Sequence, residues 1–243
     1  MNPIYLFADS IPLFSKQADG SSFLREVVQS AGVERPSVAY VGASNDDNLV
    51  FYHEIFLPAF EQAETGESRM VLARPTRGDG AFLERADIIL LAGGSVEHGW
   101  RTFEGNGFKS LIGRRYLEGA MLLGISAGAV QIGRGGLTDD ESTLFPTFGF
   151  LPLYVGTHEE HDDWKSLRRI LSFNDGPAQG VGIQAGGGLL YLGGEVLPVC
   201  KPLFEIWVDG PGSREDLVFP PQHDTNNGIC ETERRPVSQR ETR

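Results

Sequence analysis

The sequence predicts an α/β fold with a doubly wound, mostly parallel sheet and a small antiparallel appendage near the C-terminus. Three observations support this prediction. Short apolar runs alternate with segments of helical periodicity, the apolar runs end in glycine or polar loops, and the pattern changes to short strands and glycine turns after Gly149. Such alternation is typical of a parallel sheet that is covered by helices on both faces.

The alternating pattern fills the N-terminal half of the chain. Its short apolar runs predict strands at residues 4–8, 38–41, 70–72, 87–91 and 120–123. The segments between them predict helices at residues 22–32, 49–64, 80–85 and 107–117. Pro58 should kink the second helix, because proline lacks the N–H of a helical hydrogen bond.

The C-terminal half has a different pattern. Strands are predicted at residues 151–155, 181–183, 188–191, 195–197 and 204–208, with one helix after Asp163. Gly193-Gly194 separates two of these strands and indicates a hairpin. We expect residues 1–220 to form a single domain and residues 221–243, which are nearly devoid of apolar side chains, to form a flexible tail.

Ser126 is the candidate nucleophile. It lies in Gly124-Ile125-Ser126-Ala127-Gly128, directly after an apolar strand, and G-x-S-x-G in this position is typical of a nucleophile elbow. Glycines two residues before and after the serine remove Cβ atoms that would collide in the turn. Small residues can also serve only to pack a strand against a helix, but the preceding strand favours the elbow.

A histidine near the same sheet edge would serve as the base. His158 closely follows a predicted strand, so its ring can reach the serine oxygen. His161 is the alternative, and we otherwise expect it to contact substrate.

Backbone N–H groups near the elbow would form an oxyanion hole. We expect one from Ala127, the residue after the nucleophile, and a second from Gly94 in the loop that ends a neighbouring strand. Gly93 and Ser95 flank this donor and are expected to bind substrate, although a glycine pair can also serve only to turn the chain.

Composition excludes several classes of function. The formal charge of −12 argues against nucleic acid and anionic membrane surfaces as partners, and no apolar run is long enough to span a bilayer. The N-terminus lacks the basic region of a signal peptide, so we expect a cytoplasmic protein. Cys200 and Cys230 suggest neither a disulfide framework nor a metal site, and the acidic and histidine residues at 158–163 lack metal-ligand spacing. We therefore expect no cofactor and no metal.

Three segments together resemble the aspartyl dipeptidase (peptidase E) and cyanophycinase family of serine peptidases. They are Leu91-Ala92-Gly93-Gly94, the block Gly124 to Ala129, and Gly149-Phe150-Leu151-Pro152 leading to His158. The resemblance spans residues 3–200. It implies a class I glutamine amidotransferase-like, flavodoxin-like fold in which serine replaces the amidotransferase cysteine.

The resemblance also implies an activity. It predicts hydrolysis of a small peptide or isopeptide amide, often next to an aspartyl residue, through an acyl-enzyme on Ser126 with His158 as base. Gly94 and Ala127 would supply the oxyanion hole. A small peptide would be the partner, and the sequence is compatible with a homodimer.

One departure from the family concerns the third catalytic group, which orients the histidine. The family usually carries acids in a G-I-D-E-G-like segment, whereas this chain has Gly182-Ile183-Gln184-Ala185-Gly186. Asp140 is the predicted replacement, although a solvated turn explains it equally well. Asp139, Gln184 and the acids at 159–163 are alternatives. The family's Asn-Thr after the glycine pair is also replaced, by Ser95-Val96.

Two other functions stay open at this point. The first is a catalytically impaired relative that binds a small ligand, because the usual acids are missing. The second is an esterase or acyltransferase that uses the same elbow.

Overall fold

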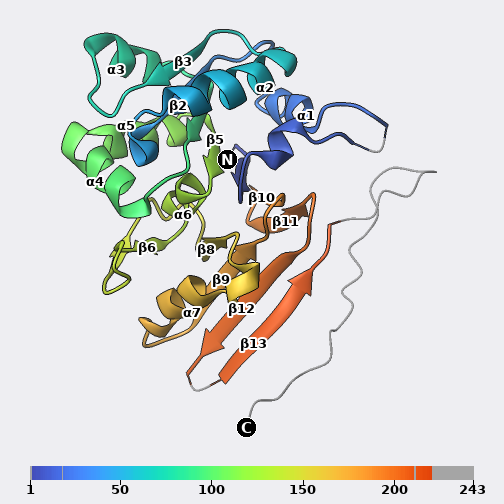
Figure 1. The fold of residues 1–243 in the computed structure, drawn as a ribbon, viewed down its shortest axis with the longest axis vertical. Coiled ribbons are helices and arrows are strands. Elements are labelled where there is room, and N and C mark those ends of the chain that lie inside the picture. The colour runs from blue at the N-terminus through green and yellow to red at the C-terminus, as the bar shows by residue number, and fades with distance from the viewer. Residues whose placement is uncertain (1, 18, 211, 221–243) are drawn as a thin grey trace.

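The structure is a computed structural model that describes residues 2–17, 19–210 and 212–220. The predicted tail at residues 221–243 therefore lies outside the described residues. Within them, an α/β core carries a second, smaller sheet (Figure 1). This agrees with the predicted fold class.

The central sheet has seven strands in the order β11-β10-β1-β5-β4-β2-β3. Its parallel strands are Ile4–Phe7 (β1), Val38–Val41 (β2), Ser68–Val71 (β3), Ile88–Leu91 (β4) and Met121–Ile125 (β5). Gly188–Leu192 (β10) pairs antiparallel with β1, and Glu195–Val199 (β11) pairs antiparallel with β10 at the edge of the sheet. Gly193 and Gly194 form the predicted hairpin turn, and both have positive φ.

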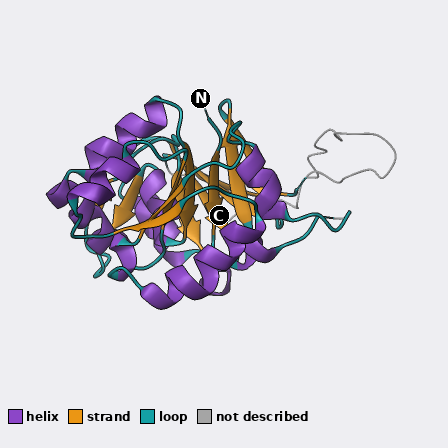
Figure 2. Cartoon of the chain, turned by 90° about the horizontal axis from the view of Figure 1, so that it is seen from above, coloured by secondary structure: helices purple, strands orange, loops and turns teal. Residues whose placement is uncertain are grey.

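Helices cover both faces of this sheet (Figure 2). One layer contains Phe23–Gln29 (α1), the π-helical segment Phe51–Phe56 (η3) and Leu57–Gln62 (α2). The other contains Arg77–Leu83 (α3), Val96–Asn106 (α4), Phe108–Leu117 (α5) and Ala127–Ile132 (α6). Strand β1 shows why the strands are apolar throughout: Ile4 and Leu6 pack on the second layer, while Tyr5 and Phe7 pack on the first.

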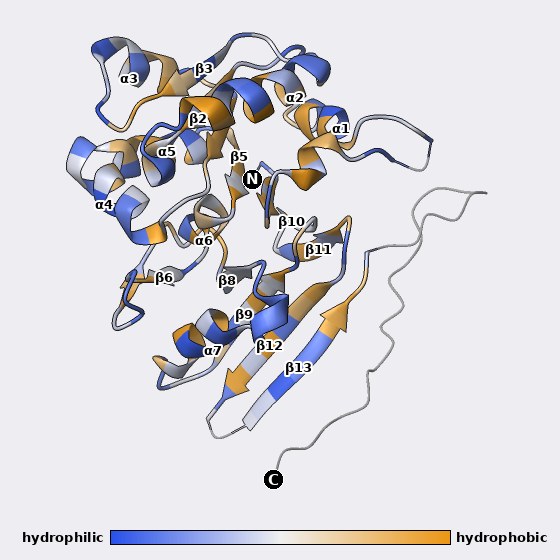
Figure 3. Ribbon diagram, in the orientation of Figure 1, coloured by the Kyte–Doolittle hydropathy of each residue, from blue (hydrophilic) through white to orange (hydrophobic). Residues whose placement is uncertain are grey.

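The second sheet has the order β13-β12-β9-β8. It consists of Tyr154–Thr157 (β8), Ala178–Ile183 (β9), Leu203–Asp209 (β12) and Gly212–Val218 (β13). Helix Lys165–Ser172 (α7) packs its apolar face on this sheet. The edge strand β13 is largely hydrophilic (Figure 3), which disfavours pairing with further strands.

Several elements differ from the predictions. The predicted helix at 107–117 is preceded by α4, which the sequence analysis missed, and Gly107 separates the two with φ +82°. Before Pro58, Leu57 N–H bonds to the carbonyl of Tyr52, so the predicted kink takes the form of a π-helical segment. The strand predicted at 151–155 begins later, at Tyr154.

A short hairpin and three 3-10 helices complete the described structure. The hairpin pairs Gly135–Leu137 (β6) with Leu144–Pro146 (β7). The 3-10 helices are Ile11–Phe14 (η1), Ala43–Asn45 (η2) and Glu160–Asp162 (η4). No helix in the described part of the chain is both long and apolar enough to cross a membrane.

Candidate active site

Ser126 lies in a sharp turn between β5 and α6. Its backbone has φ +49° and ψ −111°, a conformation that L-residues rarely adopt. The turn is fixed because Ser126 N–H bonds to the carbonyl of Phe7, at 2.9 Å, and its own carbonyl accepts the N–H of Ala129, also at 2.9 Å. The half-buried serine is thereby held at the carboxyl edge of the sheet.

The flanking glycines are required by close backbone approach. A Cβ on Gly124 would lie 2.7 Å from the carbonyl oxygen of Gly128, and one on Gly128 would lie 2.1 Å from that of Leu91. These distances are far below van der Waals contact. The G-x-S-x-G pattern therefore follows from the geometry of the turn.

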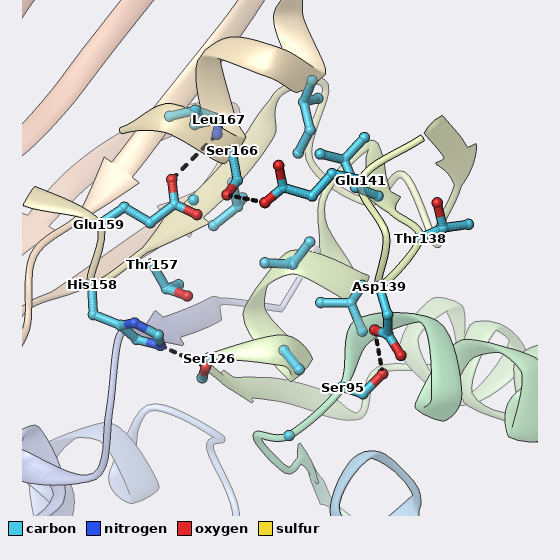
Figure 4. A pocket seen from close by; sticks show the side chains of 18 residues that line it. Ser95, Ser126, Thr138, Asp139, Glu141, Thr157, His158, Glu159, Ser166 and Leu167 are labelled. Atoms are coloured by element: carbon cyan, nitrogen blue, oxygen red, sulfur yellow. Dashed lines mark hydrogen bonds between the residues drawn. The ribbon is translucent and has the colours of Figure 1, made fainter. Parts of the chain in front are cut away.

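His158 directly follows β8 and faces the serine. Its Nε2 lies 2.9 Å from Ser126 Oγ (Figure 4). The histidine N–H bonds to the carbonyl of Ile183 at 2.8 Å, and its φ of +47° turns the chain out of the strand. The exposed ring thus reaches the central sheet from the second sheet, and this contact joins the two sheets at one edge.

The loop after β4 faces the same serine. A Cβ on Gly93 would lie 3.3 Å from Ser126 Cβ, and Gly94 has φ +131° with no room for a Cβ beside the Ser44 carbonyl. Among the described residues, neither Gly94 N–H nor Ala127 N–H donates a hydrogen bond. Both predicted oxyanion donors are therefore available to a ligand near Ser126.

The structure does not bring Asp140 to His158. The Asp140 carboxylate accepts hydrogen bonds from Thr138 Oγ1 at 2.6 Å, Ser142 Oγ at 2.7 Å and Ser142 N–H at 3.0 Å. The hydroxyl bonds from Thr138 and Ser142 lower the pKa of Asp140 to about 2. The three local donors thus bind this aspartate within the turn of the β6–β7 hairpin, and its carboxylate makes no hydrogen bond to the His158 ring.

Three other candidates for the third group are also bonded elsewhere. Asp139 accepts from Ser95 Oγ, Gln184 donates to the carbonyl of Pro202, and Glu159 accepts from Leu167 N–H. Among the described residues, the only hydrogen bond of the His158 ring is the one to Ser126.

Glu160 differs from these residues in one respect. Its Oε1 accepts the N–H of Ala185 at 3.2 Å, whereas its Oε2 is buried with no hydrogen-bond partner among the described residues. A buried, unpaired carboxylate oxygen is unusual in a folded protein. Ala185 lies in the segment where the resemblance would place an acid, so Glu160 brings a carboxylate to that segment from another part of the chain.

His161 does not reach the site. It is exposed on η4 and lines neither of the two cavities beside Ser126. Ser95 does line a cavity, and it also caps α4 by accepting His98 N–H at 3.0 Å.

Two cavities flank the Ser126–His158 pair, and Gly94 lies between them. The first, of about 290 Å³, extends between the β6–β7 hairpin and α7 and is lined by Asp139, Glu141 and Glu159 among others. The second, of about 330 Å³, is lined largely by the start of the chain and the 45–51 segment. Glu141 is not predicted as a site residue by the sequence, because the hairpin that carries it has no strong strand pattern.

Comparison with known proteins identifies the family. The model of peptidase family S51 matches residues 8–198. The chain belongs to peptidase family S51. A curated relative, the uncharacterized peptidase YgaJ of Bacillus subtilis (strain 168), is 25% identical over 159 residues, which cover 64% of this chain and 67% of that protein. The predicted resemblance to peptidase E is confirmed.

Solved structures show the same fold. A peptidase from an acI-B1 Actinobacterium aligns with a TM-score of 0.65 and 15% identity, over 88% of this chain and 96% of that one. A putative peptidase E protein from Listeria monocytogenes EGD-e aligns with a TM-score of 0.60 and 16% identity, over 82% and 98% of the two chains. This S51 member is therefore a peptidase by family, with a peptidase E-type fold.

Proposed function

We propose that this S51 peptidase is a serine hydrolase that cleaves a small peptide amide through an acyl-enzyme on Ser126. The observation that carries the proposal is the 2.9 Å contact between Ser126 Oγ and His158 Nε2, at a strained elbow with unused backbone donors on both sides. Nucleophile, base and oxyanion donors in this arrangement support acyl transfer.

In the proposed reaction, His158 Nε2 takes the proton of Ser126 as the serine oxygen attacks the amide carbon. The N–H groups of Gly94 and Ala127 stabilise the oxyanion. The imidazolium then protonates the leaving amine, and the carbon–nitrogen bond breaks to give the acyl-enzyme. Water then loses a proton to His158 and attacks the ester carbon. The imidazolium returns this proton to Ser126 Oγ as the carbon–oxygen bond breaks, which releases the acid and restores the serine. No cofactor takes part in these steps.

We also propose Glu160, rather than Asp140, as the residue that positions the His158 ring. Glu160 follows His158 by two residues, and its Oε1 binds Ala185 N–H, two residues after the Ile183 carbonyl that accepts the His158 N–H. Its Oε2 has no hydrogen-bond partner among the described residues. Catalytic hydrogen bonds are often long in the free enzyme and tighten when substrate binds. Glu160 would then accept the second ring N–H and stabilise the imidazolium.

The test is hydrolysis of a dipeptide panel, including Asp-Xaa and isoaspartyl peptides, by wild type and Ser126→Ala. We expect turnover that the substitution abolishes, and labelling of Ser126 by a fluorophosphonate. Absence of both in the wild type would refute the activated serine.

A ligand-binding protein without turnover is the second candidate, and one observation favours it. Among the described residues, no carboxylate bonds to the His158 ring. This candidate predicts ligand binding that is unchanged by Ser126→Ala.

A further inference from the structure

The first cavity beside Ser126 has an unusual charge. It contains three carboxylates, Asp139, Glu141 and Glu159, and none of the described residues that line it is a lysine or arginine (Figure 4). The same cavity is lined by Ser126 and His158, so its charge acts on whatever part of a substrate lies beside the scissile bond.

The carboxylates are held in place by neutral donors. Asp139 Oδ1 accepts from Ser95 Oγ at 2.9 Å, and Glu141 Oε1 accepts from Ser166 Oγ at 3.1 Å. Glu159 Oε2 accepts from the N–H of Leu167 at 3.3 Å. Each group uses one oxygen in this way, and the second oxygen has no hydrogen bond among the described residues.

No cation neutralises these groups within the described structure. None of the three takes part in an ion pair, whereas Arg168 on the adjacent helix pairs with Asp163 and Glu215. Arg169 donates to the main-chain oxygen of Glu141, not to its carboxylate. The nearby arginines are therefore engaged elsewhere.

Two of the carboxylates converge on one point of α7. Glu141, from the β6–β7 hairpin, and Glu159, which follows β8, bind the adjacent residues Ser166 and Leu167. Figure 4 shows them on opposite sides of the upper part of the cavity, with the Ser126–His158 pair below. A cation between the two carboxylates would interact with both of them. Paired carboxylates favour an ammonium or a guanidinium group in this position, because they attract its charge and accept its hydrogen bonds.

We infer that this cavity binds a cationic group of the substrate, an ammonium or a guanidinium, and selects basic over acidic peptides. The inference rests on the proposed hydrolase function and narrows its substrate class. It departs from the expectation of an aspartyl substrate, because a carboxylate in this cavity would meet three like charges without a compensating cation.

The experiment compares matched peptide amides that carry lysine, norleucine or glutamate at a single position, placed in turn on each side of the scissile bond. Each is made with a free and an acetylated N-terminus, which distinguishes a side-chain cation from a terminal ammonium. We expect kcat/KM for the best cationic peptide to exceed that of its norleucine analogue at least tenfold, with the glutamate peptide poorest. Equal or better hydrolysis of the glutamate peptide would overturn the inference.

The matched variants are Glu141→Gln, which keeps an oxygen for Ser166, and Glu104→Gln on the surface of α4. Glu141→Gln should raise KM for the cationic peptide about tenfold and change that of the norleucine peptide by less than twofold. Glu104→Gln should leave both unchanged. An equal effect of Glu141→Gln on both peptides would indicate a structural role only and would refute charge recognition.

A binding measurement separates this inference from the proposed reaction. Calorimetry on Ser126→Ala tests the same peptides without turnover. Tighter binding of the lysine peptide than of the glutamate peptide supports the inference even where the wild type hydrolyses neither. If Ser126→Ala binds the peptides without this preference, the inference is wrong, even if the wild type hydrolyses them.

Discussion

Gln131 Nε2 donates a hydrogen bond to Ser44 Oγ at 3.0 Å, although the glutamine side chain is completely buried. The same nitrogen donates to the carbonyl of Val96, also at 3.0 Å. Ser44 in turn accepts the N–H of Ser95 on its carbonyl oxygen at 2.8 Å. One amide therefore connects α6, which begins next to Ser126, with both segments that flank Gly94.

Replacing this amide should affect stability and catalysis together. Gln131→Leu removes the amide partner of the buried Ser44 hydroxyl, at a cost of about 1–3 kcal/mol for the unsatisfied group, and also removes the side-chain hydrogen bond to the Val96 carbonyl. We expect a lower free energy of unfolding in urea and a fall in kcat larger than the change in KM, because the Gly94 donor is less well fixed. Gln62→Leu, on the exposed side of α2, is the control and should unfold like the wild type. An unchanged midpoint for Gln131→Leu would show that the network does not stabilise the fold.

The elbow glycine Gly128 should not tolerate even alanine. The added Cβ would meet the carbonyl oxygen of Leu91 at 2.1 Å, and that oxygen belongs to the buried backbone of β4. We expect Gly128→Ala to lose at least about 2 kcal/mol of stability, as overpacked sites do, and to lose activity. Thermal unfolding measures the effect.

Gly105→Ala is the matched control for this substitution. Gly105 lies within α4 and has nothing within 4 Å of an added Cβ. Because alanine is the better helix former by about 1 kcal/mol, the control should melt at the same or a higher temperature. Equal behaviour of the two variants would contradict the steric account of the elbow.

The sequence predicted those parts of the site that depend on local pattern. The elbow at Ser126 and the glycine pair after β4 follow adjacent parallel strands, which bring their carboxyl ends to one edge. His158 also follows an apolar strand, β8, but this strand belongs to the second sheet. The Gly193-Gly194 hairpin was predictable for the same reason, because a two-residue turn carries its own signal.

The parts of the candidate site that the sequence did not predict depend on contacts between distant segments. Asp140 was a reasonable acid by position, but Thr138 and Ser142 bind it locally. The arrangement of Glu160 beside Ala185, and of Glu141 beside Ser166, depends on how the second sheet and α7 pack. No periodicity in a single segment encodes such pairs.

The two acids can be distinguished by isosteric substitution. Asp140→Asn retains the oxygen that accepts from Thr138 and Ser142, so the turn should persist and kcat should stay within about twofold of wild type. Glu160→Gln retains an oxygen for Ala185 but removes the charge that would stabilise the His158 imidazolium, so kcat should fall at least about tenfold. Steady-state kinetics across pH provide the measurement, because a positioning role changes the pH profile as well as the rate. The reverse ranking would reinstate Asp140.

Acidification gives an independent check on Asp140. Its folded pKa, about 2, lies below the ordinary value of 3.8, so its contribution to stability is present above pH 3.8 and is lost as the pH falls toward 2. The turn that carries Asp139 and Glu141 should therefore stay ordered at pH 4. Hydrogen exchange of the Ser142 amide, which donates to Asp140, measures this. Fast exchange already at pH 4 would contradict it.

Tyr40 should make the protein sensitive to alkali. Its ring is fully buried and packs against Tyr52 and Phe56 of η3. Burial raises the pKa of the phenol to about 12, although the hydrogen bond from Asn45, at 3.0 Å, acts to lower it. Between pH 10 and 12 the unfolded chain loses this proton while the folded chain keeps it, so stability falls as the pH rises. Because one pKa unit corresponds to 1.36 kcal/mol, the difference between the folded and the unfolded pKa of Tyr40 corresponds to about 2–3 kcal/mol of the free energy of unfolding.

Tyr40→Phe isolates this contribution. At pH 8 the variant should be slightly less stable, because Asn45 loses its acceptor. Between pH 10 and 12 it should lose stability less steeply than the wild type, although Tyr5, Tyr52 and Tyr116, whose pKa values are also raised by burial, keep some dependence in both proteins. Urea unfolding at pH 8 and pH 11 gives the two differences. If the wild type and the variant differ by the same amount at both pH values, Tyr40 is not the group that titrates, and the alkaline sensitivity must come from the other tyrosines.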